Sequence, residues 1–320
     1  MEESERRPWQ LFSWPRVGVV DVGSNAIRVT IAEVAAKEIR EIESIRFSLR
    51  LGKEVFNNKH TLSSKTQDNL IDIFSQIKKI FAENEITLYR AMATAALRSA
   101  RNRKRVLSRV LKHTGIKIEL ISPMEEGRLI GASLPKRHFA KRELLMDLGG
   151  GSLELAYYEK SHLKGITSLP LGAVRLLGAM KEKELPTDFL CRHIANICRN
   201  DPFVWKFTGH PPHNLFVVGS GGNIRALYRL RKRLLHRSCS IHPVLSLNDL
   251  AKITQKIEHM NEKQREKTLK LAKDRADVIL PAAYAFYEIL NYVGAKEIHI
   301  PMTVSLRRGT LVDVQRKLFG

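Results

Sequence analysis

Two acidic turns rich in glycine follow short apolar strands in this sequence of 320 residues. The first reads Asp21-Val-Gly23-Ser24-Asn25, and the second reads Asp147-Leu-Gly149-Gly150-Gly151-Ser152. Glycine has no Cβ, so the backbone N–H groups of such turns can approach an oxygen-rich ligand. Carboxylates are the oxygen ligands that divalent cations prefer. The pattern predicts a cleft where Asp21 and Asp147 hold a divalent cation, directly or through water, and the glycines cradle phosphoryl oxygens.

A third glycine turn, Gly219-Ser-Gly221-Gly222-Asn223, has a strand before it and helical spacing after it. The alternative for any one of the three turns is a tight hairpin without a ligand, but the duplicated Asp-x-Gly pattern favours a phosphate site. The phosphate loop G-x-x-x-x-G-K-[ST] is absent. Ile224 stands where the dinucleotide fingerprint has its third glycine, which argues against a Rossmann dehydrogenase.

Adjacent carboxylates, Glu125 and Glu126, lie where a strand is expected to end and a helix to begin. Ser122 and Glu125 have the spacing of a capping box, with Pro123 at the first helical position. Glu126 points about 100° further round the helix and has no capping role. It is a candidate general base that would deprotonate water, and the alternative is an ordinary solvated glutamate.

The elements that must position these groups alternate between strand and helix. Apolar residues at helical spacing predict a helix over 65–81, and a strand over 88–93 precedes Thr94, a candidate N-cap for a basic helix through Leu111. A further strand is expected over 117–121. Because strand, acidic glycine turn and strand occur twice, we expect an α/β protein with two related lobes that face each other.

The composition restricts the partners. Lys and Arg number 54 against 33 Asp and Glu, a formal net charge of +21, and three cysteines are too few for a disulfide framework. No apolar run is long enough to span a bilayer and the amino terminus lacks a signal core, so we expect a cytoplasmic protein without a membrane partner. The charge indicates a polyanionic partner or mere solubility. Few aromatic residues interleave the basic clusters, which makes nucleic acid an unfavoured partner.

Several blocks together resemble the exopolyphosphatase/guanosine pentaphosphate phosphohydrolase family. Besides the three glycine turns, they are Ala93–Asn102, Glu125–Leu129, Ser168–Arg175 and Arg275–Asp277, and they occur in the family's order between about residues 17 and 312. The resemblance implies two ribonuclease-H-like lobes, as in actin, sugar kinases and heat-shock chaperones, that flank a cleft. We expect a short arm over 1–15, lobe I over 16–128 completed by 306–320, and lobe II over 129–305.

The resemblance also assigns roles to particular residues. Glu126 matches the catalytic glutamate, and Asp147 and Glu154 match acidic residues that hold magnesium or position the attacking water. The phosphate turns correspond to Asp21, Gly23, Ser24 and Asn25, to Gly149, Gly150, Gly151 and Ser152, and to Gly221 and Gly222. Arg98 matches an arginine that would hold a phosphate in the cleft. Mg²⁺, or another divalent cation, is the implied cofactor.

This sequence departs from the family pattern at three places, none of which removes a predicted catalytic group. Asn223 stands in place of Thr, Gly127 in place of Ala, and Arg308 in place of an acidic residue. The expected activity is a magnesium-dependent hydrolase that releases terminal orthophosphate from inorganic polyphosphate. The alternatives are a guanosine pentaphosphate 5′-phosphohydrolase or a sensor that binds polyphosphate or nucleotide without hydrolysis. A homodimer is a further possibility.

Overall fold

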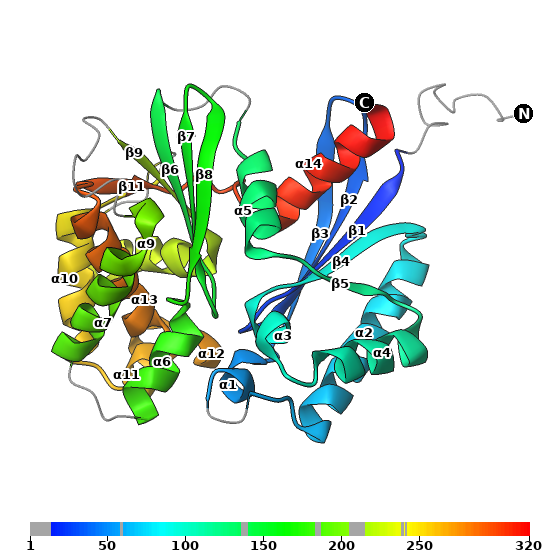
Figure 1. Ribbon diagram of the computed structural model, residues 1–320, viewed down its shortest axis with the longest axis horizontal. Helices are drawn as coiled ribbons and strands as arrows, with labels where there is room; N and C mark the ends of the chain where they lie inside the picture. Colours follow the sequence, from blue (N-terminus) through cyan, green and yellow to red (C-terminus); the bar gives the residue numbers. More distant parts are fainter. Residues whose placement is uncertain are drawn as a thin grey trace, which may run out of the picture.

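The computed structural model describes residues 14–57, 60–135, 140–182, 187–204, 215–237, 240 and 242–320. The structure consists of two mixed β-sheets. Each sheet carries helices on its outer face, and one further pair of helices lies between the two sheets (Figure 1). We call the first sheet with its helices lobe I and the second sheet with its helices lobe II. The expected arm over 1–15 falls almost entirely outside the described residues.

The sheet of lobe I has the strand order β3-β2-β1-β4-β5. Strands β1, β2 and β3 form an antiparallel meander, and β4 and β5 are parallel to β1. The strands are β1 (Arg16–Val22), β2 (Ile27–Val34), β3 (Ile39–Phe47), β4 (Leu88–Ala93) and β5 (Ile118–Leu120). Valine, isoleucine and alanine dominate β1 and β2, as expected for strands buried on both faces.

The sheet of lobe II repeats this topology in the order β8-β7-β6-β9-β11, with β10 added at the edge. Again three strands form an antiparallel meander, and β9 is parallel to the first of them. The strands are β6 (Arg142–Leu148), β7 (Leu153–Glu159), β8 (His162–Leu169), β9 (Phe216–Ser220), β10 (Val244–Ser246) and β11 (Glu297–His299). The predicted duplication and the fold class of two ribonuclease-H-like lobes are confirmed.

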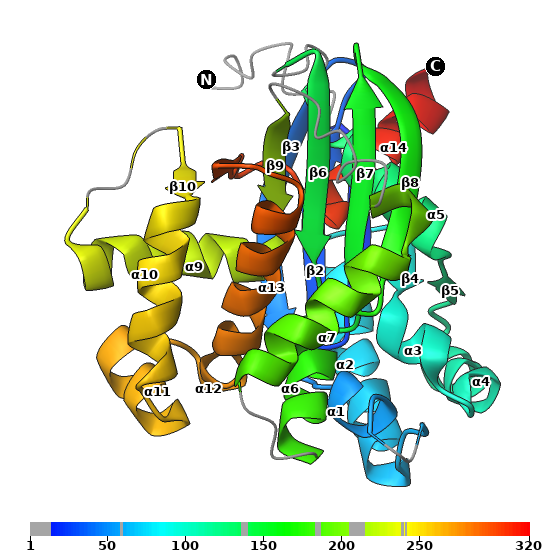
Figure 2. The same cartoon turned by 60° about the vertical axis from the view of Figure 1, so that its left-hand side comes forward.

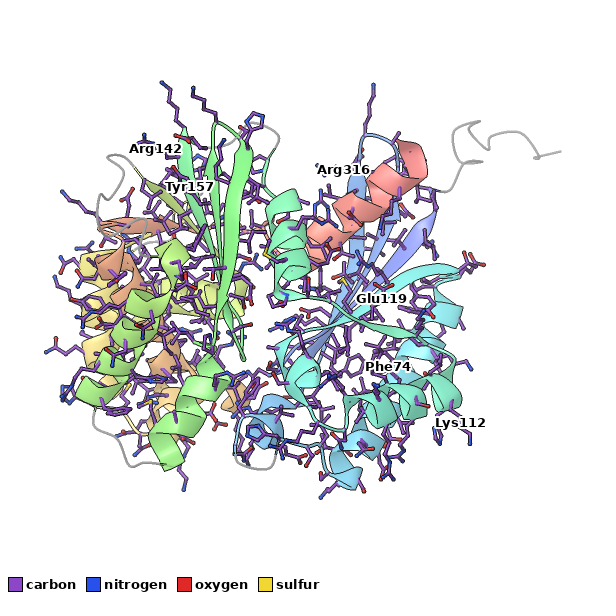
Figure 3. All side chains as sticks on the ribbon, viewed as in Figure 1. Phe74, Lys112, Glu119, Arg142, Tyr157 and Arg316 are labelled. Carbon is purple, nitrogen blue, oxygen red and sulfur yellow. The ribbon has the colours of Figure 1, made fainter. Side chains whose placement is uncertain are left out.

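Helices cover the outer face of each sheet. In lobe I, α2 and α4 pack on the sheet, and Phe74 of α2 is fully buried there, whereas Lys112 of α4 is exposed (Figure 3). In lobe II, α13 lies among α6, α7, α9 and α10 (Figure 2). The helices outside the central layer are α1 (Gly52–Val55), α2 (Ser64–Glu83), α3 (Ala95–Ser99), α4 (Arg103–Thr114), α6 (Ala173–Glu182), α7 (Thr187–Asn200), α9 (Gly221–Leu235), α10 (Leu247–Glu258), α11 (Glu262–Leu269), α12 (Lys273–Ala276) and α13 (Ile279–Tyr292).

Two helices, α5 (Pro123–Ala132) and α14 (Leu306–Phe319), lie between the sheets and pack on each other (Figure 1). Helix α14 contacts β1, β2 and β3, and α5 contacts β7 and β8. Gly309 permits this close approach, because a Cβ at that position would overlap the backbone carbonyl of Leu129. Each lobe has a hydrophobic core of its own, and a further core fills this layer, so the lobes share a packed interface. The expected boundary between residues 128 and 129 falls inside α5.

The prediction of one basic helix from Thr94 through Leu111 is wrong. The chain forms α3, becomes extended at Ala100, and begins α4 at Arg103, and the Thr94 side chain makes no capping hydrogen bond. Asn102 explains the break. Its side chain donates to the carbonyl of Leu62 and accepts from the amide of the same residue, at 2.8 and 3.1 Å. This tertiary contact overrides the local helical pattern.

Candidate active site

The predicted site residues converge on one cavity of about 140 Å³ between the lobes. It lies where β1, β6 and β9 end and their glycine turns begin. The predicted residues that line it are Asp21, Gly23, Ser24, Asn25, Glu126, Asp147, Gly149, Gly150, Gly151, Ser152, Gly221 and Gly222. Arg98 and Glu154 do not line the cavity, but each is adjacent to a carboxylate that does.

The two acidic turns have the same hairpin geometry. The amide of Gly23 donates to the carbonyl of Ala26 at 3.1 Å, and the amide of Gly149 donates to the carbonyl of Ser152 at 3.0 Å. The register that results pairs Asp21 with Arg28 across the first hairpin and Asp147 with Glu154 across the second. The duplicated hairpins therefore present an acid–base pair in lobe I and a pair of acids in lobe II.

The turns of the two lobes contact each other directly. A Cβ on Gly150 would lie 2.9 Å from the Cβ of Ser24, and one on Gly151 would lie 2.9 Å from the Ser24 hydroxyl oxygen. Gly221 in the third turn has φ of +92°, and a Cβ there would lie 2.8 Å from Oδ1 of Asp147. Glycine is therefore required by close approach at two positions and by backbone conformation at the third.

Glu126 lies in the first turn of α5, whose N-cap is Ser122. The Ser122 hydroxyl accepts from the amide of Glu125 at 3.1 Å, but the Glu125 carboxylate pairs with Arg128 and Arg90, so only half of the expected capping box forms. Glu126 is 6% exposed, which rejects the alternative of a solvated glutamate. Nη1 of Arg98 donates to Oε2 of Glu126 at 3.2 Å, and Arg98 thus holds this carboxylate.

Burial and mutual repulsion raise the proton affinity of the carboxylates at the cavity. Burial, followed by the charge of Glu154, raises the pKa of Glu126 well above its usual range, and Arg98 opposes this shift. Burial also raises the pKa of Glu154 to about 7. The pKa values of Asp21 and Asp147 are raised mainly by burial as well. Four acids that disfavour each other's charge form a site where a cation would be stabilising.

The expected metal ligands fit a divalent cation that is only partly coordinated by protein. Oδ1 of Asp147 and Oε2 of Glu154 are buried and have no hydrogen-bond partner among the described residues. The other oxygen of Glu154 accepts from Ser168 at 2.9 Å. Within the described part of the chain, no three His, Cys, Asp or Glu side chains form a ready-made metal cage. Mg²⁺ commonly binds through one or two carboxylates together with water and substrate phosphates, and the orphaned oxygens suit that mode.

Four arginines line the cavity: Arg28, Arg225, Arg275 and Arg307. Arg225 follows the third glycine turn, a position that predicts a side chain facing the cleft, whereas the other three carried no such prediction. None of the four forms an ion pair among the described residues. Burial lowers the pKa of Arg225, Arg275 and Arg307, and the charge of Arg28 lowers each of these pKa values further, whereas the carboxylates of Asp147 and Asp21 oppose the shift at Arg225 and Arg307. Four half-buried guanidinium groups gathered at one cavity suit the binding of an anion, and Arg225, Arg275 and Arg307 also donate hydrogen bonds to protein oxygens.

The side chain of Asn25 is occupied elsewhere. Its amide nitrogen donates to the carbonyl of Asp274 at 2.8 Å, and its oxygen accepts from Arg50 at 2.7 Å. Only the backbone of Asn25 remains for a phosphate. Asn223, one of the departures noted above, donates to the carbonyl of Leu148 at 3.0 Å and so joins the third turn to the second.

The sequence profile of the Ppx/GppA phosphatase family matches residues 30–318. The chain belongs to this family. It is similar to exopolyphosphatase 1 of Mycobacterium tuberculosis, with 28% identity over 84% of this chain and 79% of that protein. It is also similar to the guanosine-5′-triphosphate,3′-diphosphate pyrophosphatase of Aliivibrio fischeri, with 25% identity over 87% of this chain and 55% of that protein. The chain thus spans little more than half the length of the second relative.

The fold of the Ppx/GppA family recurs in a solved exopolyphosphatase from Cytophaga hutchinsonii. That structure superposes with a TM-score of 0.83 at 20% identity and covers 94% of this chain and 98% of its own. The family assignment made from the motifs is confirmed, and with it the class of enzyme, a phosphatase. In the described part of the chain no helix has the length and apolar character needed to cross a membrane.

Proposed function

We propose that this member of the Ppx/GppA family is an exopolyphosphatase that hydrolyses the terminal phosphoanhydride bond of inorganic polyphosphate with a divalent cation. The single observation that carries the proposal is the cavity itself, which sets Glu126, Asp147 and three glycine turns beside four arginines that form no ion pair among the described residues. The family membership and the mycobacterial relative agree with it. The acidic groups would accept the proton of the attacking water and hold the cation, and the basic groups would bind the phosphates.

In this mechanism Glu126 accepts a proton from the attacking water. The water oxygen forms a bond to the terminal phosphorus, the bridging P–O bond breaks, and the leaving chain keeps the bridging oxygen and its electron pair. A carboxylate buried from solvent is a stronger base than an exposed one, and a general base works best with a pKa near the working pH. Arg98 orients this carboxylate and keeps its pKa from rising further.

Asp147 and Glu154, with Asp21 opposite, would hold Mg²⁺ or another divalent cation through their unpartnered oxygens and through water. When bound, the cation supplies neutralisation of the phosphoryl charge that grows in the transition state. The backbone N–H groups of the glycine turns and the guanidinium groups of Arg28, Arg225 and Arg275 would bind the phosphoryl oxygens.

A second candidate substrate is guanosine pentaphosphate, because the Aliivibrio relative carries the name of an enzyme that acts on it. The cavity favours polyphosphate. Its lining among the described residues includes no aromatic side chain on which a purine could stack, and its polar groups suit a chain of repeated phosphates. A sensor that binds without hydrolysis is the third candidate, and the four acids gathered at the cavity, Asp21, Glu126, Asp147 and Glu154, argue against it.

The test incubates the purified chain with long-chain polyphosphate or with guanosine pentaphosphate, with Mg²⁺ or with a chelator, and follows release of orthophosphate. We expect magnesium-dependent release that is faster from polyphosphate. Faster release from guanosine pentaphosphate would favour the second candidate. Binding of either substrate without release would favour the sensor.

A further inference from the structure

A group of side chains joins the two lobes beside the cavity. The segment over 46–50, which contains the last two residues of β3 and the three that follow it in lobe I, reaches α12 and Asp277 in lobe II. Arg50 makes most of these contacts. Its Nη2 donates to the carbonyl of Asp274 at 2.6 Å and to Oδ1 of Asp277 at 2.9 Å, and its Nη1 pairs with Oδ2 of Asp277. Arg50 thus binds Asp277 with both arms of its guanidinium fork.

The same guanidinium also holds the first phosphate turn. Nε of Arg50 donates to the side-chain oxygen of Asn25 at 2.7 Å, and the Asn25 amide donates to the carbonyl of Asp274 at 2.8 Å. Arg50 and Asn25 of lobe I and the carbonyl of Asp274 in lobe II are therefore joined in a closed ring of hydrogen bonds. Asn25 is part of the turn that lines the cavity, so this ring reaches the phosphate site.

On the other side, α12 contacts the third phosphate turn. Nη1 of Arg275 donates to the carbonyl of Gly222 at 2.5 Å and to the side-chain oxygen of Asn223 at 3.3 Å. A chain of contacts therefore runs from the first phosphate turn through Arg50 and α12 to the third phosphate turn. A displacement at Arg50 would change the distance between two turns that line the same cavity and, in the function proposed above, bind the substrate phosphates.

Two ion pairs between the lobes differ in burial, and the more buried pair is expected to contribute more to stability. The side chains of Arg50 and Asp277 are 18% and 11% exposed, so their charges are poorly screened by solvent. The nearby pair of Arg46 and Asp274 is more exposed on its arginine, at 34%, and Arg46 makes no contact with Asn25 among the hydrogen bonds described. Such an outer pair contributes little to stability.

We propose that Arg50 is a positioning residue that fixes the spacing of the first and third phosphate turns across the two lobes. The proposal rests on the function proposed above, because it assigns to those turns the binding of substrate phosphates. Arg50 itself lies outside the cavity lining and would act on the substrate only through Asn25 and α12.

The test compares Arg50→Gln with Arg46→Gln as the matched control, measuring kcat and KM on polyphosphate and the affinity for inorganic tripolyphosphate by calorimetry. Loss of a charged, bidentate contact between buried groups typically has a large effect. We expect Arg50→Gln to raise KM and the Kd for tripolyphosphate by about tenfold or more. Arg46→Gln should change both by less than about twofold. Arg50→Lys, which keeps the charge without the fork, should recover only part of the loss.

A double-mutant cycle with Asp277→Asn separates positioning from general destabilisation. If the two residues act as one unit, the double variant should bind tripolyphosphate about as weakly as Arg50→Gln alone. A lower unfolding midpoint with unchanged KM and tripolyphosphate affinity would overturn the proposal and leave Arg50 a structural role only. Failure of the proposed function is a different result: wild type would then release no orthophosphate, whereas the effect of Arg50→Gln on tripolyphosphate binding could still be measured.

Discussion

At the scale of single residues, the two hairpins differ in the residue that faces each aspartate. Arg28 faces Asp21 in lobe I and Glu154 faces Asp147 in lobe II, each seven positions after its aspartate. Because the turn fixes the register of a hairpin, this pairing could have been read from the sequence. The pairing makes the lobe I side of the site, with its arginine, suited to phosphate and the lobe II side, with two acids, suited to a cation.

Glu154 gives a test of the electrostatics that needs no substrate. Its pKa is raised by burial to about 7, above the value of an unfolded chain, so the folded state binds its proton more tightly. Stability from this group is present below about pH 4.5 and is lost as pH rises towards about 7. In metal-free buffer, Glu154→Gln should therefore raise the free energy of unfolding at about pH 8, by about 1–3 kcal/mol, with little change at about pH 4.

Chemical denaturation at the two pH values measures this difference. Glu159→Gln is the control, because Glu159 lies on the same strand, is 38% exposed and pairs with Arg142 at the surface. It should shift stability by less than about 0.5 kcal/mol at either pH. A loss of stability in Glu154→Gln at the higher pH would contradict the account of the buried acids.

At the scale of elements, the local signals predicted how each site residue is presented. Ser122 and Pro123 begin α5 as expected, and this places Glu126 inside the protein while Glu125 faces a network of ion pairs. The sequence did not predict the break between α3 and α4, because the contact of Asn102 with Leu62 depends on the tertiary structure. That break ends α3 one residue after Arg98.

The contact between the turns predicts different effects for two glycine substitutions. Gly151→Ala places a methyl group 2.5 Å from the Cβ of Ala95 and 2.9 Å from Oγ of Ser24, so the turns of the two lobes must separate. Activity should fall by about 100-fold, in line with the cost of a small displacement of binding groups. Gly178→Ala in α6 meets no atom within 4 Å and replaces a poor helix former, and it should stabilise by about 0.5–1 kcal/mol with unchanged activity.

Orthophosphate release and thermal unfolding of both variants check this pair. Full activity in Gly151→Ala would mean that the two turns need not be in contact for turnover.

At the scale of the whole molecule, the duplicated turns predicted the two lobes, but the contacts between lobes lay beyond sequence reasoning. Arg307 and Arg28 meet in the cavity although they are far apart in the chain. Arg50 and Asp277 are similarly remote, at a sequence separation of 227. Neither local spacing nor secondary-structure propensity carries information about such pairs.

The net charge of +21 predicts how the protein responds to salt. Charges outside the cavity attract a long polyanion over distances that salt screens, since the Debye length falls from about 30 Å at 0.01 M to about 10 Å at 0.1 M. KM for long-chain polyphosphate should rise several-fold over this range, whereas KM for tripolyphosphate, with fewer charges outside the cavity, should rise less. Initial rates at a series of NaCl concentrations measure both, and equal salt dependence for the two substrates would contradict a role for the outer charge.

Two adjacent carboxylates allow a direct test of whether Glu126 activates water. Glu126 is buried at the cavity and held by Arg98, whereas Glu125 points away and pairs with Arg128 and Arg90. The measurement is the rate of orthophosphate release from polyphosphate by Glu126→Gln and Glu125→Gln. Loss of the general base should lower kcat of the first variant by about 100-fold or more, and the second should stay within a few-fold of wild type. Comparable rates in both variants would contradict Glu126 as the group that activates water.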